Sequence, residues 1–191
     1  MKNIKLAALA LTLIFATSCK KNKKEAIEET EVEEVVKGTS TEKMLTVNLS
    51  PKSDSKVEGV VTFKENDGVV TMTAKMTGLT EGTHAIHIHE KADCSSPDGK
   101  SSGGHWNPTG QPHGKWGVDT GYHKGDIGNF KVATDGEGIV TLATDEWCIG
   151  CGDDTKDITG KAVVVHQGTD DFTSQPSGAA GARVSCAGII E

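Results

Sequence analysis

Aromatic residues make up only 4% of this 191-residue chain, and hydrophobic residues only 35%. So few aromatic side chains argue against an aromatic-lined ligand pocket, and the small apolar fraction supports one compact core at most. The chain also lacks a basic surplus, because its formal net charge is −7. Nucleic-acid binding requires clustered positive charge that neutralises phosphates, so we exclude a nucleic-acid partner.

A long hydrophobic run is missing as well. The apolar run at residues 6–16 is about eleven residues long, whereas a membrane-spanning helix needs about twenty. Lysines precede this run and small residues follow it, an order typical of a secretory signal peptide over residues 1–18. The segment from Ala16 to Cys19 resembles a bacterial lipoprotein cleavage box, which predicts that Cys19 is lipidated. We therefore expect an exported cell-envelope lipoprotein, held to the periplasmic or outer side of a membrane through its lipid anchor only.

The segment after this leader, residues 19–43, is dense in charge. Lysines are followed by glutamates, with few apolar residues between them. This composition predicts a disordered tether. A short helix is the alternative, but no second apolar surface is present to bury it.

Apolar and polar residues begin to alternate at residue 44. Alternation in short runs bounded by turn residues predicts strands, and Asn66-Asp67-Gly68 predicts a hairpin turn. The predicted strands cover residues 45–49, 57–64, 69–73, 83–90, 127–134, 139–144, 162–166 and 183–190. Eight short strands make residues 44–191 an all-β domain, either a sandwich or a barrel.

Two irregular segments interrupt the strands. Residues 91–126 hold eight of the 23 glycines and three of the five prolines, without periodicity. Loops of this length are uncommon in a compact domain unless a metal ion or a disulfide orders them. The segment 167–182 is shorter and similarly rich in glycine, serine and proline. Both are candidate functional loops.

All seven histidines lie between residues 84 and 166. His87 and His89 are two apart in a predicted strand, so both rings project from the same face. The other candidates are His105, His113, His123 and Asp126 in the first loop, and His166 at the end of an apolar strand. Imidazole suits copper and zinc, and three histidines with one carboxylate suit a tetrahedral zinc site. The cluster therefore predicts a metal centre.

Six blocks of the sequence resemble the copper/zinc superoxide dismutases in order and spacing. They are residues 82–90 (GTHAIHIHE), 104–108 (GHWNP), 113–114, 123–129 (HKGDIGN), 165–171 and 181–186 (GARVSC). The resemblance covers roughly residues 44–191. It implies an eight-stranded antiparallel Greek-key β-barrel with two long functional loops.

The resemblance also implies the ligands of two ions. Copper would be held by His87, His89, His105 and His166, and zinc by His105, His113, His123 and Asp126. The ring of His105 would bridge the two ions as an imidazolate. Asp170 would accept hydrogen bonds from His87 and His113 and fix both rings. His84 has no ligand role in the family, and we expect it to bond to neighbouring backbone.

The activity implied by the resemblance is dismutation of superoxide to molecular oxygen and hydrogen peroxide. Copper would cycle between oxidation states while zinc, which cannot, would have a structural role. Arg183, the only arginine in the chain, would dock the superoxide anion, and His105 would supply a proton. A non-enzymatic copper carrier or buffer on the same barrel is the alternative. Whether the protein forms a homodimer stays open.

The negative net charge of the chain affects how an anionic substrate reaches the site. Loss of residues 1–18 with their two lysines would change the formal charge from −7 to −9. Attraction of superoxide would then depend on positive charge near the copper. The segment 167–182 contains no lysine. Lys115 and Lys124 are the candidates to supply the charge, and solvated loop lysines without a steering role are the alternative.

The five cysteines predict an oxidising compartment. With Cys19 lipidated, an even set of four remains for disulfides. Cys94 and Cys186 match the disulfide of the family. Cys148 and Cys151 depart from the family pattern, and we interpret them as a second, local disulfide, with a redox-active or metal-capturing pair as the alternative.

Overall fold

The computed structural model of this chain describes residues 42–190. The predicted signal peptide, Cys19 and the predicted tether up to residue 41 lie outside the described residues. Within residues 42–190, no helix is long and apolar enough to cross a membrane.

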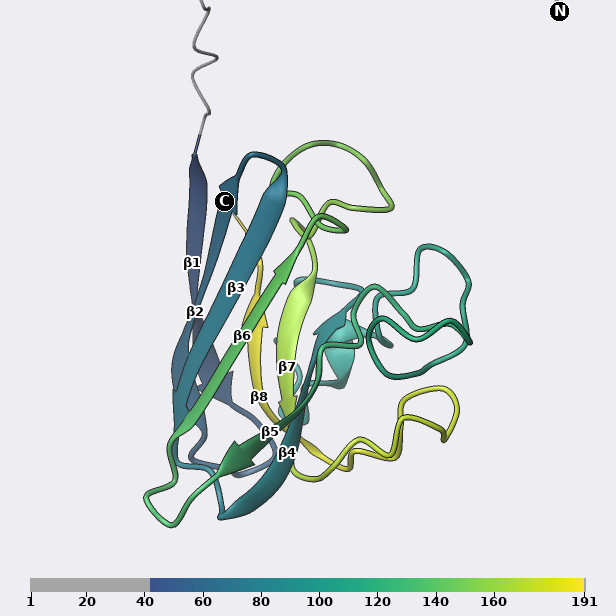
Figure 1. Cartoon of the computed structure of the whole chain (residues 1–191). Helices are drawn as coiled ribbons and strands as arrows, with labels where there is room; N and C mark the ends of the chain where they lie inside the picture. The colour runs from purple at the N-terminus through teal and green to yellow at the C-terminus, as the bar shows by residue number, and fades with distance from the viewer. Residues whose placement is uncertain (1–41, 191) are drawn as a thin grey trace, which may run out of the picture. The chain divides into compact units, whose positions relative to one another are not determined.

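Eight strands form one antiparallel sheet that curls into a nearly closed barrel (Figure 1). They are β1 (Lys43–Pro51), β2 (Glu58–Asn66), β3 (Val69–Thr77), β4 (Gly82–His89), β5 (Gly128–Val132), β6 (Gly138–Thr144), β7 (Ala162–His166) and β8 (Arg183–Gly188). One short 3-10 helix, η1 (Lys100–Ser102), lies between β4 and β5. The all-β prediction with eight strands is therefore confirmed.

The order of the strands in the sheet is β5-β4-β7-β8-β1-β2-β3-β6. The chain crosses from β3 to β4 and from β6 to β7 between strands that are not neighbours, which gives the predicted Greek-key topology. The two edge strands, β5 and β6, approach each other and narrow the remaining seam. Near closure leaves few exposed strand edges.

The hairpin between β2 and β3 forms where it was predicted. Asn66 pairs with Val69 across a two-residue loop, and Asp67 and Gly68 have φ values of 50° and 78°. Positive φ at both loop positions is what a type I′ turn requires, and Asp-Gly meets that requirement.

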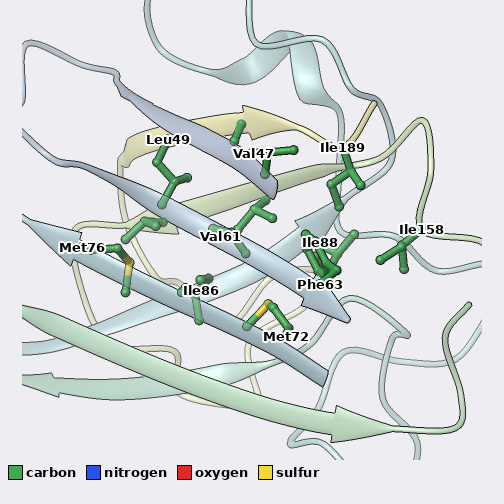
Figure 2. Close-up of a cluster of buried hydrophobic side chains, with 14 of the residues drawn as sticks. Val47, Leu49, Val61, Phe63, Met72, Met76, Ile86, Ile88, Ile158 and Ile189 are labelled. Atoms are coloured by element: carbon green, nitrogen blue, oxygen red, sulfur yellow. The ribbon is translucent and has the colours of Figure 1, made fainter. Parts of the chain in front are cut away.

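The alternation of apolar and polar residues along each strand determines which side chains form the core. In β3, Val70, Met72, Ala74 and Met76 are buried, while the residues between them face outward. Figure 2 shows Val47, Val61, Phe63, Ile86 and Ile88 converging from β1, β2 and β4. This cluster also includes Ile158, which comes from the loop between β6 and β7.

The two predicted loops project from the same side of the barrel (Figure 1). Gln175 in the second loop accepts a hydrogen bond from the His113 backbone N and donates one to its carbonyl O, each at 2.9 Å. The loops are thus joined to each other as well as to the barrel.

Both predicted disulfides are present. Cys94–Cys186 ties the first loop to β8 across a separation of 92 residues, and Cys148–Cys151 closes a turn of three. In the chain-entropy model the long loop contributes about 4.6 kcal/mol to stability and the short one about 2 kcal/mol.

Candidate metal centre

The strand β4 carries the first two candidate ligands. Ile86 and Ile88 point into the barrel core (Figure 2), so His87 and His89 project from the opposite, outer face, as predicted. Both rings are nevertheless buried, because the first loop crosses over them. Ile88 N donates to Gly125 O at 2.9 Å, and Trp106 N donates to Ile88 O at 2.8 Å.

Four imidazole rings come together on the outer face of β4. The nearest ring nitrogens of His87, His89, His105 and His166 all lie within 4.8 Å of one another. Nε2 of His89 and Nε2 of His166 are 3.3 Å apart, and the rings of His87 and His105 have centroids 3.9 Å apart. Four buried imidazoles with converging nitrogens are the donor set that copper prefers.

A second group gathers around one carboxylate. Its members are His105, His113, His123 and Asp126, again with donor atoms within 4.8 Å of one another. Asp126 Oδ1 lies 2.8 Å from His105 Nδ1 and 3.2 Å from His123 Nδ1. Its Oδ2 lies 3.0 Å from His113 Nδ1. Three imidazoles and one carboxylate match a closed zinc site.

The ring of His105 belongs to both groups. Its Nδ1 faces Asp126 in the second group, while its Nε2 is buried without a hydrogen-bond partner. Three more buried ring nitrogens have no hydrogen-bond partner: His87 Nδ1, His113 Nδ1 and His123 Nδ1. Buried polar atoms are rarely left unsatisfied. A cation in each group would satisfy all four, so these residues fit a copper and a zinc ion.

Hydrogen bonds on the far side of the rings orient them. His87 Nε2 donates to Asp170 Oδ2 and His113 Nε2 donates to Asp170 Oδ1, each at 2.9 Å. His89 Nδ1 donates to Gly103 O at 3.0 Å. Each bond fixes which nitrogen carries the proton and which stays free for a cation. The position of Asp170 between two rings is the one that the resemblance implied.

Close packing holds Asp170 in place. A Cβ at Gly178, whose φ is 66°, would lie 1.8 Å from Asp170 Oδ1. Asn129 also clamps the backbone of Asp170, since its amide donates to Asp170 O and accepts from Asp170 N, each at 2.8 Å. The Asp170 carboxylate can therefore reach the rings only because Gly178 has no side chain.

Burial keeps the imidazoles of the first group neutral. Desolvation lowers the pKa of His87 and, with neighbouring rings, lowers the pKa of His89 and His166 well below the ordinary value. The pKa of His105 falls to about 4 for the same reason. Neutral imidazole is the form that binds a metal.

The carboxylates at the second group, Asp126 within it and Asp170 beside it, are ionised. Burial alone would raise the pKa of Asp126 and Asp170, but hydrogen bonds from the histidine rings outweigh it and lower both. Burial also opposes protonation of His113, yet the negative charges of Asp126 and Asp170 beside its ring raise its pKa to about 9. A divalent cation in this group would supply the positive charge that the proton on His113 supplies without it.

A cavity of about 730 Å³ opens onto the first group. His89, His105 and His166 line it together with Arg183. Arg183 is partly buried, and its Nη1 donates to Gly99 O at 2.9 Å and to Ser102 Oγ at 3.0 Å. The guanidinium thus stands beside the imidazoles at the point where solvent reaches them.

The lysine at the cavity is not one of the two that were expected there. Neither Lys115 nor Lys124 lines this cavity, and Lys124 is paired with Glu146. The lysine that does line it is Lys100 of η1, which lies 3.0 Å from Asp98 Oδ2. No local pattern in the sequence marks the loop turn that carries Lys100 to the cavity.

His84 is in neither group. Its Nδ1 lies 3.0 Å from His166 O and its Nε2 lies 2.8 Å from Thr80 O. These backbone contacts match the structural role expected for it.

A further set of supporting residues was not predicted. Trp147 Nε1 donates to Lys124 O at 2.9 Å. Glu146 accepts from Tyr122 OH at 2.5 Å and also from Lys124. These contacts hold the segment that carries His123 and Asp126 against the loop between β6 and β7. No periodicity or motif signals them.

Comparisons with known proteins agree with this geometry. A sequence profile described as copper/zinc superoxide dismutase matches residues 57–189. A protein named superoxide dismutase [Cu-Zn] from Caulobacter vibrioides is 38% identical over 142 residues, which cover 72% of this chain and 80% of that protein. The crystal structure of a double mutant of a SOD-like protein from Bacillus subtilis superposes with a TM-score of 0.67 at 31% identity, covering 76% of this chain and 97% of that one.

Proposed function

The chain belongs to the copper/zinc superoxide dismutase family, and on that premise we propose that its two buried clusters bind copper and zinc and share the ring of His105. The reaction converts two superoxide anions and two protons into one O2 and one H2O2. One superoxide is oxidised and the other reduced, so electrons and atoms balance without a further reactant.

The proposed copper ligands are His87, His89, His105 and His166, and the proposed zinc ligands are His105, His113, His123 and Asp126. The observation that carries this assignment is the set of four buried ring nitrogens without hydrogen-bond partners, two in each group. When bound, copper supplies the one-electron redox chemistry, whereas zinc keeps one oxidation state.

His105 has the position of a proton carrier. Its Nε2 points into the first group and is free of hydrogen bonds, while its Nδ1 is held at Asp126. In our proposal this Nε2 would be a ligand of the first group's cation, and it would hold a proton when it is not bound. A proton held there is donated to the departing peroxide at the cavity.

Arg183 has the position of an anion-docking group. Burial lowers the pKa of the guanidinium, but arginine stays charged in proteins. The bonds to Gly99 and Ser102 use Nη1 and fix the plane of the group at the cavity wall. A charge fixed there orients superoxide toward the imidazoles.

A copper carrier is the competing proposal. A carrier has no need for an arginine beside the copper ligands or for a ring shared with a second site. The presence of Arg183 in the same cavity lining as His89 and His166, and of His105 in both groups, therefore supports the dismutase. Consumption of superoxide by the purified domain separates the two. We expect the copper- and zinc-loaded protein to consume superoxide at least a hundredfold faster than the metal-free protein, whereas equal rates would favour the carrier.

We also propose export and lipidation. Residues 1–18 would be removed as a signal peptide, Cys19 would carry the lipid, and residues 19–43 would tether the domain of residues 44–191 to the cell envelope. Two disulfides support an oxidising location. Incorporation of a labelled fatty acid, and its loss in Cys19→Ser, tests the anchor; label retained in that variant would contradict it.

A further inference from the structure

The disulfide Cys148–Cys151 lies outside both candidate metal groups. It closes a turn in the loop between β6 and β7. Asp157 braces this turn, because its carboxylate accepts hydrogen bonds from the backbone N of Gly150 at 3.0 Å and of Gly152 at 2.9 Å. The same carboxylate accepts from Thr159. Asp157 is therefore engaged in holding the turn and is a poor third ligand for a metal.

The two cysteines of this disulfide differ in exposure. Cys148 is buried, with 6% of its surface exposed, whereas Cys151 is exposed. In the other disulfide, Cys186 is 1% exposed and Cys94 only partly exposed. Thiol–disulfide exchange needs an attacking thiolate to reach one sulfur. Within residues 42–190, Cys151 is the most accessible target.

The consequences of reduction also differ. Breaking Cys94–Cys186 frees a loop of more than ninety residues, whereas breaking Cys148–Cys151 frees a turn of three. The entropy gained by the unfolded chain grows with loop length. The short disulfide can therefore be reduced while the barrel and the long disulfide remain intact.

The neighbouring residues connect this turn to the proposed zinc ligands. Cys148 follows Trp147 directly, and the Trp147 indole donates to Lys124 O. Lys124 lies between His123 and Asp126 in the chain. The ring of Trp147 also packs edge-on against Trp116, with centroids 5.5 Å apart. A backbone shift at Cys148 would therefore displace Trp147, and Trp147 contacts the segment that carries the proposed ligands His123 and Asp126.

We propose that Cys148–Cys151 is a thiol–disulfide exchange site for an external dithiol, and that its reduction loosens the segment of residues 122–126. A thiolate of the dithiol attacks Cys151 Sγ, the Cys148–Cys151 bond breaks, and Cys148 leaves as a thiolate that takes up a proton. The second thiol of the dithiol then displaces Cys151, which is also protonated. The pair gains two electrons and two protons, and the dithiol becomes a disulfide. The exchange chemistry is independent of the proposed dismutation, whereas its effect on zinc rests on the proposed ligands.

The first experiment uses glutathione, a monothiol, so that the intermediate accumulates. The purified oxidised protein is treated with reduced glutathione, free thiols are alkylated, and both are mapped by mass spectrometry. We expect the glutathione adduct on Cys151 and the alkyl group on Cys148, with Cys94–Cys186 intact. An adduct on Cys148, or opening of Cys94–Cys186 at the same glutathione concentration, would overturn the exchange site.

The second experiment measures the effect on the zinc segment. Zinc-loaded protein is reduced with dithiothreitol until only Cys148 and Cys151 are alkylated on sampling. Amide hydrogen exchange in residues 122–126 and release of zinc to a colorimetric chelator should each become at least threefold faster. Peptides from β2 are the internal control and should not change.

The double variant Cys148→Ser, Cys151→Ser imitates the reduced state without any reductant. It should show the same accelerated exchange and zinc release, and it should not respond to dithiothreitol. A variant that behaves like the oxidised protein, or reduced protein with unchanged exchange in residues 122–126, would overturn the coupling. Dismutase activity enters neither readout, so the result is separate from that of the proposed function.

Discussion

The carboxylate of Asp170 lies between the rings of His87 and His113 and accepts a hydrogen bond of 2.9 Å from Nε2 of each. One ring belongs to the first group of four and the other to the second. A single side chain from the second loop therefore orients one ligand of each proposed site, and both sites depend on how that loop is seated.

Asp170→Asn tests this arrangement. An amide presents one acceptor and one donor, so one of the two Nε2–H groups would face an NH2 group and its ring would turn or change tautomer. Loss of such a supporting bond typically weakens metal binding by about 10- to 100-fold, and competition with a chelator measures it for copper and zinc separately. The exposed neighbour Asp171→Asn is the matched control. Wild-type affinity in Asp170→Asn would show that the rings are oriented without it.

Arg183→Ala tests the docking role. We expect the metal content to stay intact and the rate of superoxide consumption to fall at least tenfold, since Arg183 lines the cavity while its hydrogen bonds go to Gly99 and Ser102, which are not proposed ligands. Arg183→Lys retains the positive charge and should recover part of the rate. An unchanged rate in Arg183→Ala would remove this residue from the mechanism.

The pKa shifts predict that the metal-free domain is most stable near pH 6.5. Burial lowers the pKa of His89, His105 and His166, so below the ordinary value of 6.5 the unfolded chain binds more protons and stability falls as the pH falls. The carboxylates, chiefly those with lowered pKa, add to this loss at still lower pH. His113 acts oppositely: its pKa is raised to about 9, so its contribution is complete below pH 6.5 and is lost as the pH rises through 9.

Urea unfolding of the chelator-treated domain from about pH 5 to about pH 9.5 measures this profile. Stability that keeps rising between pH 7 and pH 9 would contradict the contribution assigned to His113. Stability that does not fall below pH 6.5 would contradict the neutral burial of the other rings.

The two disulfides are expected to contribute unequally to stability. Replacing Cys94 and Cys186 by serine should cost about 4.6 kcal/mol of unfolding free energy, and replacing Cys148 and Cys151 about 2 kcal/mol, because the first closes the longer loop. Urea midpoints of the metal-free variants give both values. A larger loss from the short disulfide would show that its turn supports more of the fold than its loop length predicts.

The strands and the two ligands on β4 could be predicted because their signals are local. Alternation marks β1 to β3, and the two-residue spacing of His87 and His89 places both rings on one face of β4. The assignment of the remaining ligands depended on resemblance to a family, since no local rule tells which loop histidines approach β4. The contacts of Trp147 and Glu146 with the zinc segment could not be predicted, because they join residues 23 and 24 positions apart through side chains in irregular loops. Strand ends were less certain: residues 127–134 were predicted as a strand, and β5 covers only Gly128–Val132, where pairing with β4 ends.

The shared ring of His105 is the central claim, and a crystal structure of the copper- and zinc-loaded protein tests it most directly. Anomalous scattering at the absorption edges of the two metals identifies each ion. We predict copper at Nε2 and zinc at Nδ1 of His105, each about 2 Å from its nitrogen. Ions that bind only one nitrogen of this ring, or that lie away from His87, His89 and His166 on one side and His113, His123 and Asp126 on the other, would contradict the account.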